Sequence, residues 1–294
     1  MKQTFQLITD MNCDLPENFA KEHKIEMMSM GYSVDGVEYL TAEHPESLDS
    51  KEFYTKMREG AVTKTVALET ELFRETAKKY LEQDMDVLYI AFSSGLSSTF
   101  QNSARIAEEL AAEYPSRKIK VVDSLCASLG QGLLVYYAAA QRDEGKRIDE
   151  VAEWVGDNRL KICHYFTVDD LNFLHRGGRV SKTTAVVGSM LGIKPVLHVD
   201  DDGHLIAIGK VRGRKQSLTA LVDRMEKKIG GNENKIVFIS HGDCEDDAKF
   251  IAEQVRKRFG IKSFLINYIG ASIGSHSGPG TAALFFVGDD RKEK

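Results

Sequence analysis

The sequence predicts an α/β fold with two domains. Short runs of β-branched and aromatic residues alternate with stretches of helical periodicity along most of the 294 residues, a pattern typical of sheets covered by helices. The chain is longer than a usual single core, and its pattern changes near residue 160. We therefore expect one domain over residues 1–160 and a second over 161–294, with a ligand site in the cleft between them.

The first half reads as repeated strand and helix units around a parallel sheet. The strands are FQLIT near the start, VLYIAF at 87–92 and IKVVD at 119–123. The helices between and after them are SKEFYTKMREG, TELFRETAKKYLEQD and TFQNSARIAEELAAEY. Residues 34–40, VDGVEYL, place Asp-Gly between β-formers and predict a hairpin.

The second half predicts a mixed sheet. A glycine-rich RGGR precedes a long segment that includes AVVGSMLGIKPVLHV, which we interpret as either core or the wall of a ligand tunnel. Asp202-Gly203 predicts another hairpin, with IAIGKVRGRK as the returning strand. The helix SLTALVDRMEKKIGG and the strand KIVFIS at 235–240 follow, and then a further helix and strand.

Composition excludes several classes of protein. Hydrophobic residues make up 42% and charged residues 28%, as in ordinary globular proteins. The net charge of -5 gives no support for nucleic-acid binding. The start MKQTFQLITD lacks the pattern of a signal peptide, so we expect a cytoplasmic protein without an integral membrane segment. The four cysteines have no metal-ligand spacing, and we expect no metal.

A serine-rich turn, AFSSGLSSTFQNSA, follows a buried strand and opens a helix. Free backbone N–H groups and hydroxyls at such a turn can bind an anion. Alternatively, Ser97, Ser98 or Thr99 only caps the helix. The G-x-S-x-G pattern of a serine hydrolase is absent from the turn.

A second candidate segment, IGASIGSHSGPGTAALFFVG, places two glycine-rich turns around His276. Glycines let a backbone approach a ligand or another backbone closely. His276 is therefore either a packing residue or a ligand contact.

Basic residues cluster in RGGRVS and VRGRK. In a chain of net negative charge they could dock an acidic partner or a phosphate-bearing surface, or they could simply belong to solvated turns. The arginines concerned are Arg176, Arg179, Arg212 and Arg214.

Taken in order, these segments resemble the DegV family across nearly the whole chain. LITDMNCDLP is similar to the family's I-T-D-S-T-S-D-L-P, and FSSGLSSTFQNSA to S-S-G-L-S-G-T-Y. FTVDDLNFLHRGGRV resembles the central L-x-x-G-G-R-I block, and IGASIGSHSGPG resembles I-G-x-x-I-G-x-H-x-G-P-G.

The resemblance implies a two-domain DegV-type α/β fold, a parallel sheet in the first domain and a mixed sheet in the second, with a fatty acid in a tunnel between them. It implies a bacterial lipid carrier without cofactor or catalytic residues. The ligand would be an acid of the palmitate, stearate or oleate class. The partner would be a soluble fatty acid kinase that makes acyl phosphate for phospholipid synthesis.

Carried over by motif, the carboxylate contacts would be Thr65, Ser93 or Ser94, and His276. We further expect the four arginines to dock the kinase, because neighbouring basic turns beside a ligand site can steer association with an acidic surface. Two departures bear on acyl specificity. TKTVALE stands where the family commonly has K-T-S-Q-P-S, and Met11, Asn12 and Cys13 replace its S-T-S.

Two other functions can be compared with that of a lipid carrier. The architecture that the family shares with the dihydroxyacetone-kinase substrate subunit would also suit a subunit that holds a small molecule for phosphotransfer. A deep apolar channel favours the lipid, and a small polar cavity favours the metabolite. A DNA-binding regulator lacks a basic domain or a reading motif.

Overall fold

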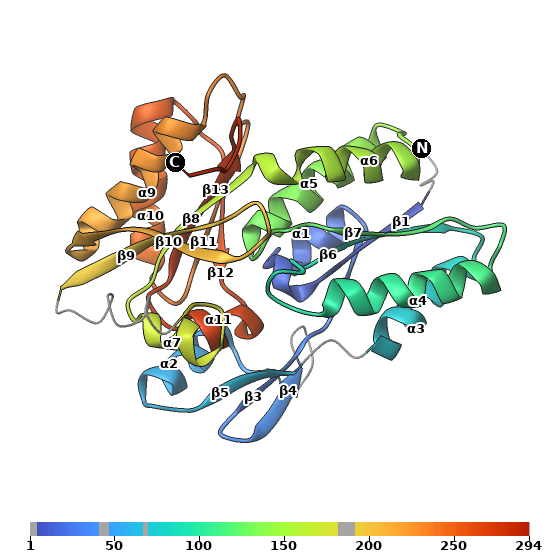
Figure 1. The fold of residues 1–294 in the computed structure, drawn as a ribbon, viewed down its shortest axis with the longest axis horizontal. Coiled ribbons are helices and arrows are strands. Elements are labelled where there is room, and N and C mark those ends of the chain that lie inside the picture. Colours follow the sequence, from blue (N-terminus) through green and yellow to red (C-terminus); the bar gives the residue numbers. More distant parts are fainter. Residues whose placement is uncertain (1–4, 41–46, 67–69, 182–191, 294) are drawn as a thin grey trace.

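The computed structural model describes residues 5–40, 47–66, 70–181 and 192–293, and it contains two large sheets and one small one (Figure 1). The first sheet is entirely parallel, with strand order β2-β1-β6-β7. Its strands are β1 Phe5–Asp10, β2 Ile25–Met28, β6 Asp86–Ala91 and β7 Ile119–Asp123.

Alternating residues of β1 and β6 enter two different cores. Ile8 and Tyr89 pack against the helices on one face, while Leu7 and Ile90 pack against those on the other. Five helices accompany this sheet: α1 Glu17–Glu22, α3 Thr70–Leu81, α4 Thr99–Glu113, α5 Leu129–Asp143 and α6 Ile148–Asn158.

The second large sheet is mixed, with strand order β10-β9-β8-β13-β11-β12. Only β11 and β12 pair in parallel; the other neighbours are antiparallel. Its strands are β8 Ile162–Thr167, β9 Ile193–Val199, β10 Leu205–Arg212, β11 Val237–His241, β12 Phe264–Tyr268 and β13 Ala282–Val287. The helices α9 Arg214–Lys228 and α10 Glu245–Phe259 pack together over one face and form a core of their own with it.

Helix α5 lies between the two large sheets and contacts β1, β8, β11 and β13 (Figure 1). Leu133, Leu134 and Val135 are all completely buried, so this helix has no single apolar stripe. One continuous core therefore joins the sheets through α5.

A third, antiparallel sheet of order β4-β3-β5 lies beside the space between the two large ones. Its strands are β3 Gly31–Val34, β4 Val37–Leu40 and β5 Thr63–Val66. Short helices accompany it: α2 Ser50–Arg58, α7 Leu171–Arg176 and α11 Ala271–Ser277. Two 3-10 turns flank strands of the large sheets: η1 Met11–Cys13 follows β1, and η2 Arg159–Lys161 precedes β8. Because α11 comes from the C-terminal half and contacts β3 and β5, this sheet ties the two halves together.

The structure confirms the two-domain α/β fold with one parallel and one mixed sheet. Both predicted hairpins form, β3–β4 through Asp35 and Gly36 and β9–β10 through residues 200–204. The boundary near residue 160 stays a prediction, although membership of the large sheets changes between β7 and β8. Within the ranges given above, no helix has both the length and the hydrophobicity required to cross a bilayer.

Candidate functional site

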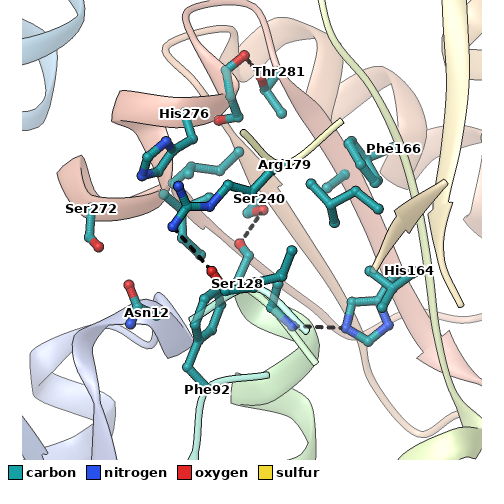
Figure 2. Close-up of a pocket in the computed structure, with 18 of the residues that line it drawn as sticks. Asn12, Phe92, Ser128, His164, Phe166, Arg179, Ser240, Ser272, His276 and Thr281 are labelled. Atoms are coloured by element: carbon teal, nitrogen blue, oxygen red, sulfur yellow. Dashed lines mark hydrogen bonds between the residues drawn. The ribbon is translucent and has the colours of Figure 1, made fainter. Parts of the chain in front are cut away.

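A cavity of about 350 Å³ lies where the two large sheets and the small sheet meet (Figure 2). Most of its wall is apolar. The apolar lining residues are Met30, Phe92, Leu96, Ala127, Phe166, Leu174, Val199, Leu205, Ile269, Ile273, Ala283 and Phe285. Such a wall suits a long hydrocarbon chain better than a small polar metabolite.

Two predicted residues meet at the wall of this cavity. Thr65 on β5 and His276 on α11 lie with Oγ1 and Nε2 2.9 Å apart. Strand β5 positions Thr65, because Thr63 and Thr65 lie on the same face of the strand. The hydroxyl of Thr63 donates to the Ser275 carbonyl at 3.3 Å and so fixes the strand against α11. The pair therefore joins the N-terminal and C-terminal halves of the chain at a polar edge of the cavity.

The imidazole of His276 is neutral at neutral pH. Burial, and to a lesser extent the positive charge of Arg179, lower its pKa to about 4. On its other side the ring packs against backbone, since a Cβ at Gly177 would lie 2.2 Å from Nδ1. The glycine of the RGGR motif thus leaves room for the ring.

Arg179 was predicted to dock a partner, but its side chain is half-buried in the cavity wall near His276. It donates to the Gly177 carbonyl and, at 3.1 Å, to the Leu96 carbonyl. No carboxylate pairs with it within the described ranges. Burial lowers the pKa of the guanidinium, as expected for a cation without a counter-ion.

The serines of the turn separate into two groups. The Ser93 hydroxyl is completely buried and donates to the Gly203 carbonyl at 2.9 Å, across to the β9–β10 turn. Ser94 donates its backbone N–H to Asp123 and, like Ser93, is not among the lining residues. Ser97 and Ser98 do line the cavity. The serine-rich turn thus reaches the cavity through a later part than the predicted Ser93 and Ser94.

The remaining arginines differ in their surroundings. Arg176 is exposed, with its guanidinium over the Phe173 ring at 4.6 Å, and Arg212 is exposed at the end of β10. Arg214 instead donates to Asp247 at 2.7 Å and to the Gly280 carbonyl at 2.6 Å. Arg214 is thus held inside the fold by Asp247 and Gly280, whereas Arg176 and Arg212 are exposed.

A buried polar chain that was not predicted includes two serines of the cavity wall, Ser128 and Ser240. Ser128 donates to the carboxylate of Asp14, and its oxygen lies 2.9 Å from that of Ser240. Asp14 also accepts from Gly270 at 2.8 Å, which links the two halves. Burial raises the pKa of Asp14 to about 7. Asp14 and Gly270 lie within two of the motifs quoted above, but the sequence did not show that they meet, because the motifs are far apart along the chain.

Two further predictions concern metals and the tunnel wall. In the described ranges, Asp200, Asp202 and His204 could together hold an ion, but Asp200 already accepts from the backbone N–H groups of the other two, as in an ordinary turn. The supposed tunnel-wall segment spans 185–199, of which residues 185–191 lie outside the described ranges, while Val199 lines the cavity.

Fold and site together define a class of protein: a two-domain α/β ligand-binding protein with an apolar interdomain cavity and a polar threonine–histidine pair at its wall. The family model described as "Uncharacterised protein, DegV family" matches residues 4–289. A DegV domain-containing protein of Clostridium perfringens is 45% identical over 98% of this chain and 99% of its own. The chain belongs to the DegV family.

Solved structures of relatives agree with this fold. A DegV lipid-binding protein of Thermotoga maritima matches with a TM-score of 0.86 and 28% identity, covering 98% of this chain and 100% of its own. A Thermus thermophilus DegV family protein, described by its fatty-acid binding, matches with a TM-score of 0.84 and 29% identity over 97% and 99%. These descriptions name binding proteins and no catalytic activity.

Proposed function

We propose that the cavity binds one long-chain fatty acid of the palmitate, stearate or oleate class, with its carboxylate at the Thr65–His276 pair. The observation that carries this proposal is an apolar cavity with a polar edge, built from both halves of the chain. Transfer of a sixteen-carbon tail from water into such a wall gains on the order of 10 kcal/mol gross, at about 0.8 kcal/mol per CH₂. The description of the Thermus thermophilus relative as a fatty-acid-binding protein supports the same ligand.

The carboxylate needs hydrogen-bond donors because a buried, unpaired anion is costly. We assign this role to Thr65, His276 and Ser97. Ser97 replaces the predicted Ser93 and Ser94, because it lines the cavity whereas the Ser93 hydroxyl is engaged with Gly203. The unpaired charge of Arg179 beside His276 adds attraction for an anion or for a phosphoryl group attached to it.

We further propose that the protein is a cytoplasmic, bacterial carrier that presents the bound acid to a fatty acid kinase for acyl-phosphate formation and phospholipid synthesis. Nucleotide and metal would then belong to the kinase. Arg176 and Arg212 are exposed cations that suit docking of an acidic kinase surface. The alternative, a phosphotransferase subunit holding a small hydroxylated metabolite, is less well supported, since such a ligand would leave most of the apolar wall unfilled.

The lipid proposal is tested by extracting the purified protein with organic solvent and identifying the extracted ligand by mass spectrometry. We expect a stoichiometric fatty acid, or uptake of added palmitate or oleate by the delipidated protein. Repeated absence of both would reject the proposal.

The kinase proposal is tested separately by acyl-phosphate formation with a purified fatty acid kinase. Arg212→Glu should slow this reaction and increase its salt sensitivity while acid binding stays unchanged. Arg105→Glu on α4, another exposed cation, is the matched control and should react as the wild type does. Equal rates for Arg212→Glu and wild type would exclude docking through Arg212.

A further inference from the structure

The polar side chains that line the cavity outside the carboxylate group include Asn12 of η1 and Ser272 of α11. These two residues have 2% and 6% of their surfaces exposed. Ser272 lies four residues before His276, and therefore one helical turn away on the same face of α11. If the carboxylate of a fatty acid is bound at His276, the hydrocarbon chain of that acid would run past Ser272.

The Ser272 hydroxyl makes no hydrogen bond to any part of the chain that the structure describes. Ser275, on the same helix and equally buried, donates to the Ala271 carbonyl at 2.7 Å. Ser128 and Ser240, elsewhere in the wall, are paired with each other. The local chain thus satisfies these other serines and leaves the hydroxyl of Ser272, and that of Ser277 in the same wall, for whatever occupies the cavity.

Asn12 supplies a complementary group. Its backbone N–H donates to Asp10 at 3.1 Å, and its side-chain amide also hydrogen-bonds the Asp10 carboxylate, which fixes the residue in place. A carboxylate can only accept hydrogen bonds, so Asp10 is bonded by the N–H of the Asn12 side-chain amide. The side-chain oxygen of Asn12 therefore remains available as an acceptor. Figure 2 shows this oxygen directed to the side of the cavity where Ser272 lies.

An unsubstituted alkyl chain offers neither group a partner, whereas a hydroxyl can donate to Asn12 and accept from Ser272. We propose that Asn12 and Ser272 form a second polar subsite that selects long-chain acids carrying a hydroxyl group near their carboxyl end. This inference rests on the proposed fatty-acid function and names a narrower ligand class. Asn12 is also one of the positions at which the sequence departs from the family's usual S-T-S.

The test compares delipidated wild type with Ser272→Ala, Asn12→Ala and the matched control Ser275→Ala. Dissociation constants are measured by competition for stearic acid and a positional series of hydroxystearic acids. In wild type, one isomer hydroxylated in the carboxyl half should bind about tenfold more tightly than stearic acid, the effect expected of one or two hydrogen bonds. Ser272→Ala and Asn12→Ala should each reduce this ratio towards one, while Ser275→Ala should keep it.

If stearic acid binds as tightly as every isomer, or if Ser272→Ala leaves all ratios unchanged, the subsite is filled by water and the inference is wrong. Should one variant fail to fold, the other still decides the question. If neither stearic acid nor any isomer binds, the fatty-acid proposal itself has failed. Tight binding of stearic acid without an isomer preference rejects only the subsite.

Discussion

The hydroxyl oxygen of Thr65 lies 2.9 Å from Nε2 of His276, although 211 positions separate them in the sequence. If this pair holds the carboxylate, Thr65→Val should weaken fatty-acid binding about tenfold or more, because the variant keeps the shape and removes one donor to a charged oxygen. Isothermal titration with palmitate measures the change. Thr63→Val on the same strand face is the matched control, since the Thr63 hydroxyl bonds the Ser275 carbonyl instead.

The two groups of serines should respond differently to substitution. Ser97→Ala should weaken binding of the acid without a large loss of stability. Ser93→Ala should lower the free energy of unfolding by about 1 kcal/mol or more, because it leaves the Gly203 carbonyl without its donor. Urea unfolding and titration of the same two variants separate these effects. The reverse outcome would return the carboxylate contact to Ser93.

Gly177→Ala should weaken binding by displacing His276. The backbone at Gly177 has a φ of -72°, so alanine fits the conformation, but its Cβ would lie 2.2 Å from Nδ1 of the ring. Gly156→Ala in α6 is the control, because nothing lies within 4 Å of the added carbon. Equal affinities for the two variants would show that the ring can shift without consequence.

His276 should contribute to the pH dependence of stability in one direction only. The unfolded chain binds a proton at this residue below about 6.5, whereas the folded chain does so only near 4, so stability should fall as the pH falls through this window. Thermal unfolding of wild type and His276→Gln between pH 4 and 8 measures this contribution as their difference. The difference should be constant above pH 7, and acid binding should show no titration of His276 there.

Arg214→Ala should destabilise the protein by about 1–3 kcal/mol, because the side chain bonds both Asp247 and the Gly280 carbonyl. Arg212→Ala, two residues away and exposed, should change stability by less than about 0.5 kcal/mol. Urea unfolding of both variants provides the comparison. Similar values for the two would mean that the Arg214 contacts contribute little.

Strand periodicity and Asp-Gly turns predicted much of this fold, because each is a local property. Helix α5 was not predicted: it is buried between two sheets, and a helix without a polar face lacks the usual periodic signal. The motifs also contain segments that line the cavity. They could not show which serine faces the cavity, or that Arg179 points inward, because both depend on how the β9–β10 turn and α7 pack against the turn before α4.

The position of β13 has a consequence for biosynthesis. This strand lies between β8 and β11, and it carries Ala283 and Phe285 of the cavity wall. Residues 282–287 follow the other five strands of this sheet in chain order, so a nascent chain has a gap in the middle of its larger sheet until they are synthesised. If the cavity binds an acyl chain as we propose, loading must therefore follow translation of β13 and its insertion into the sheet.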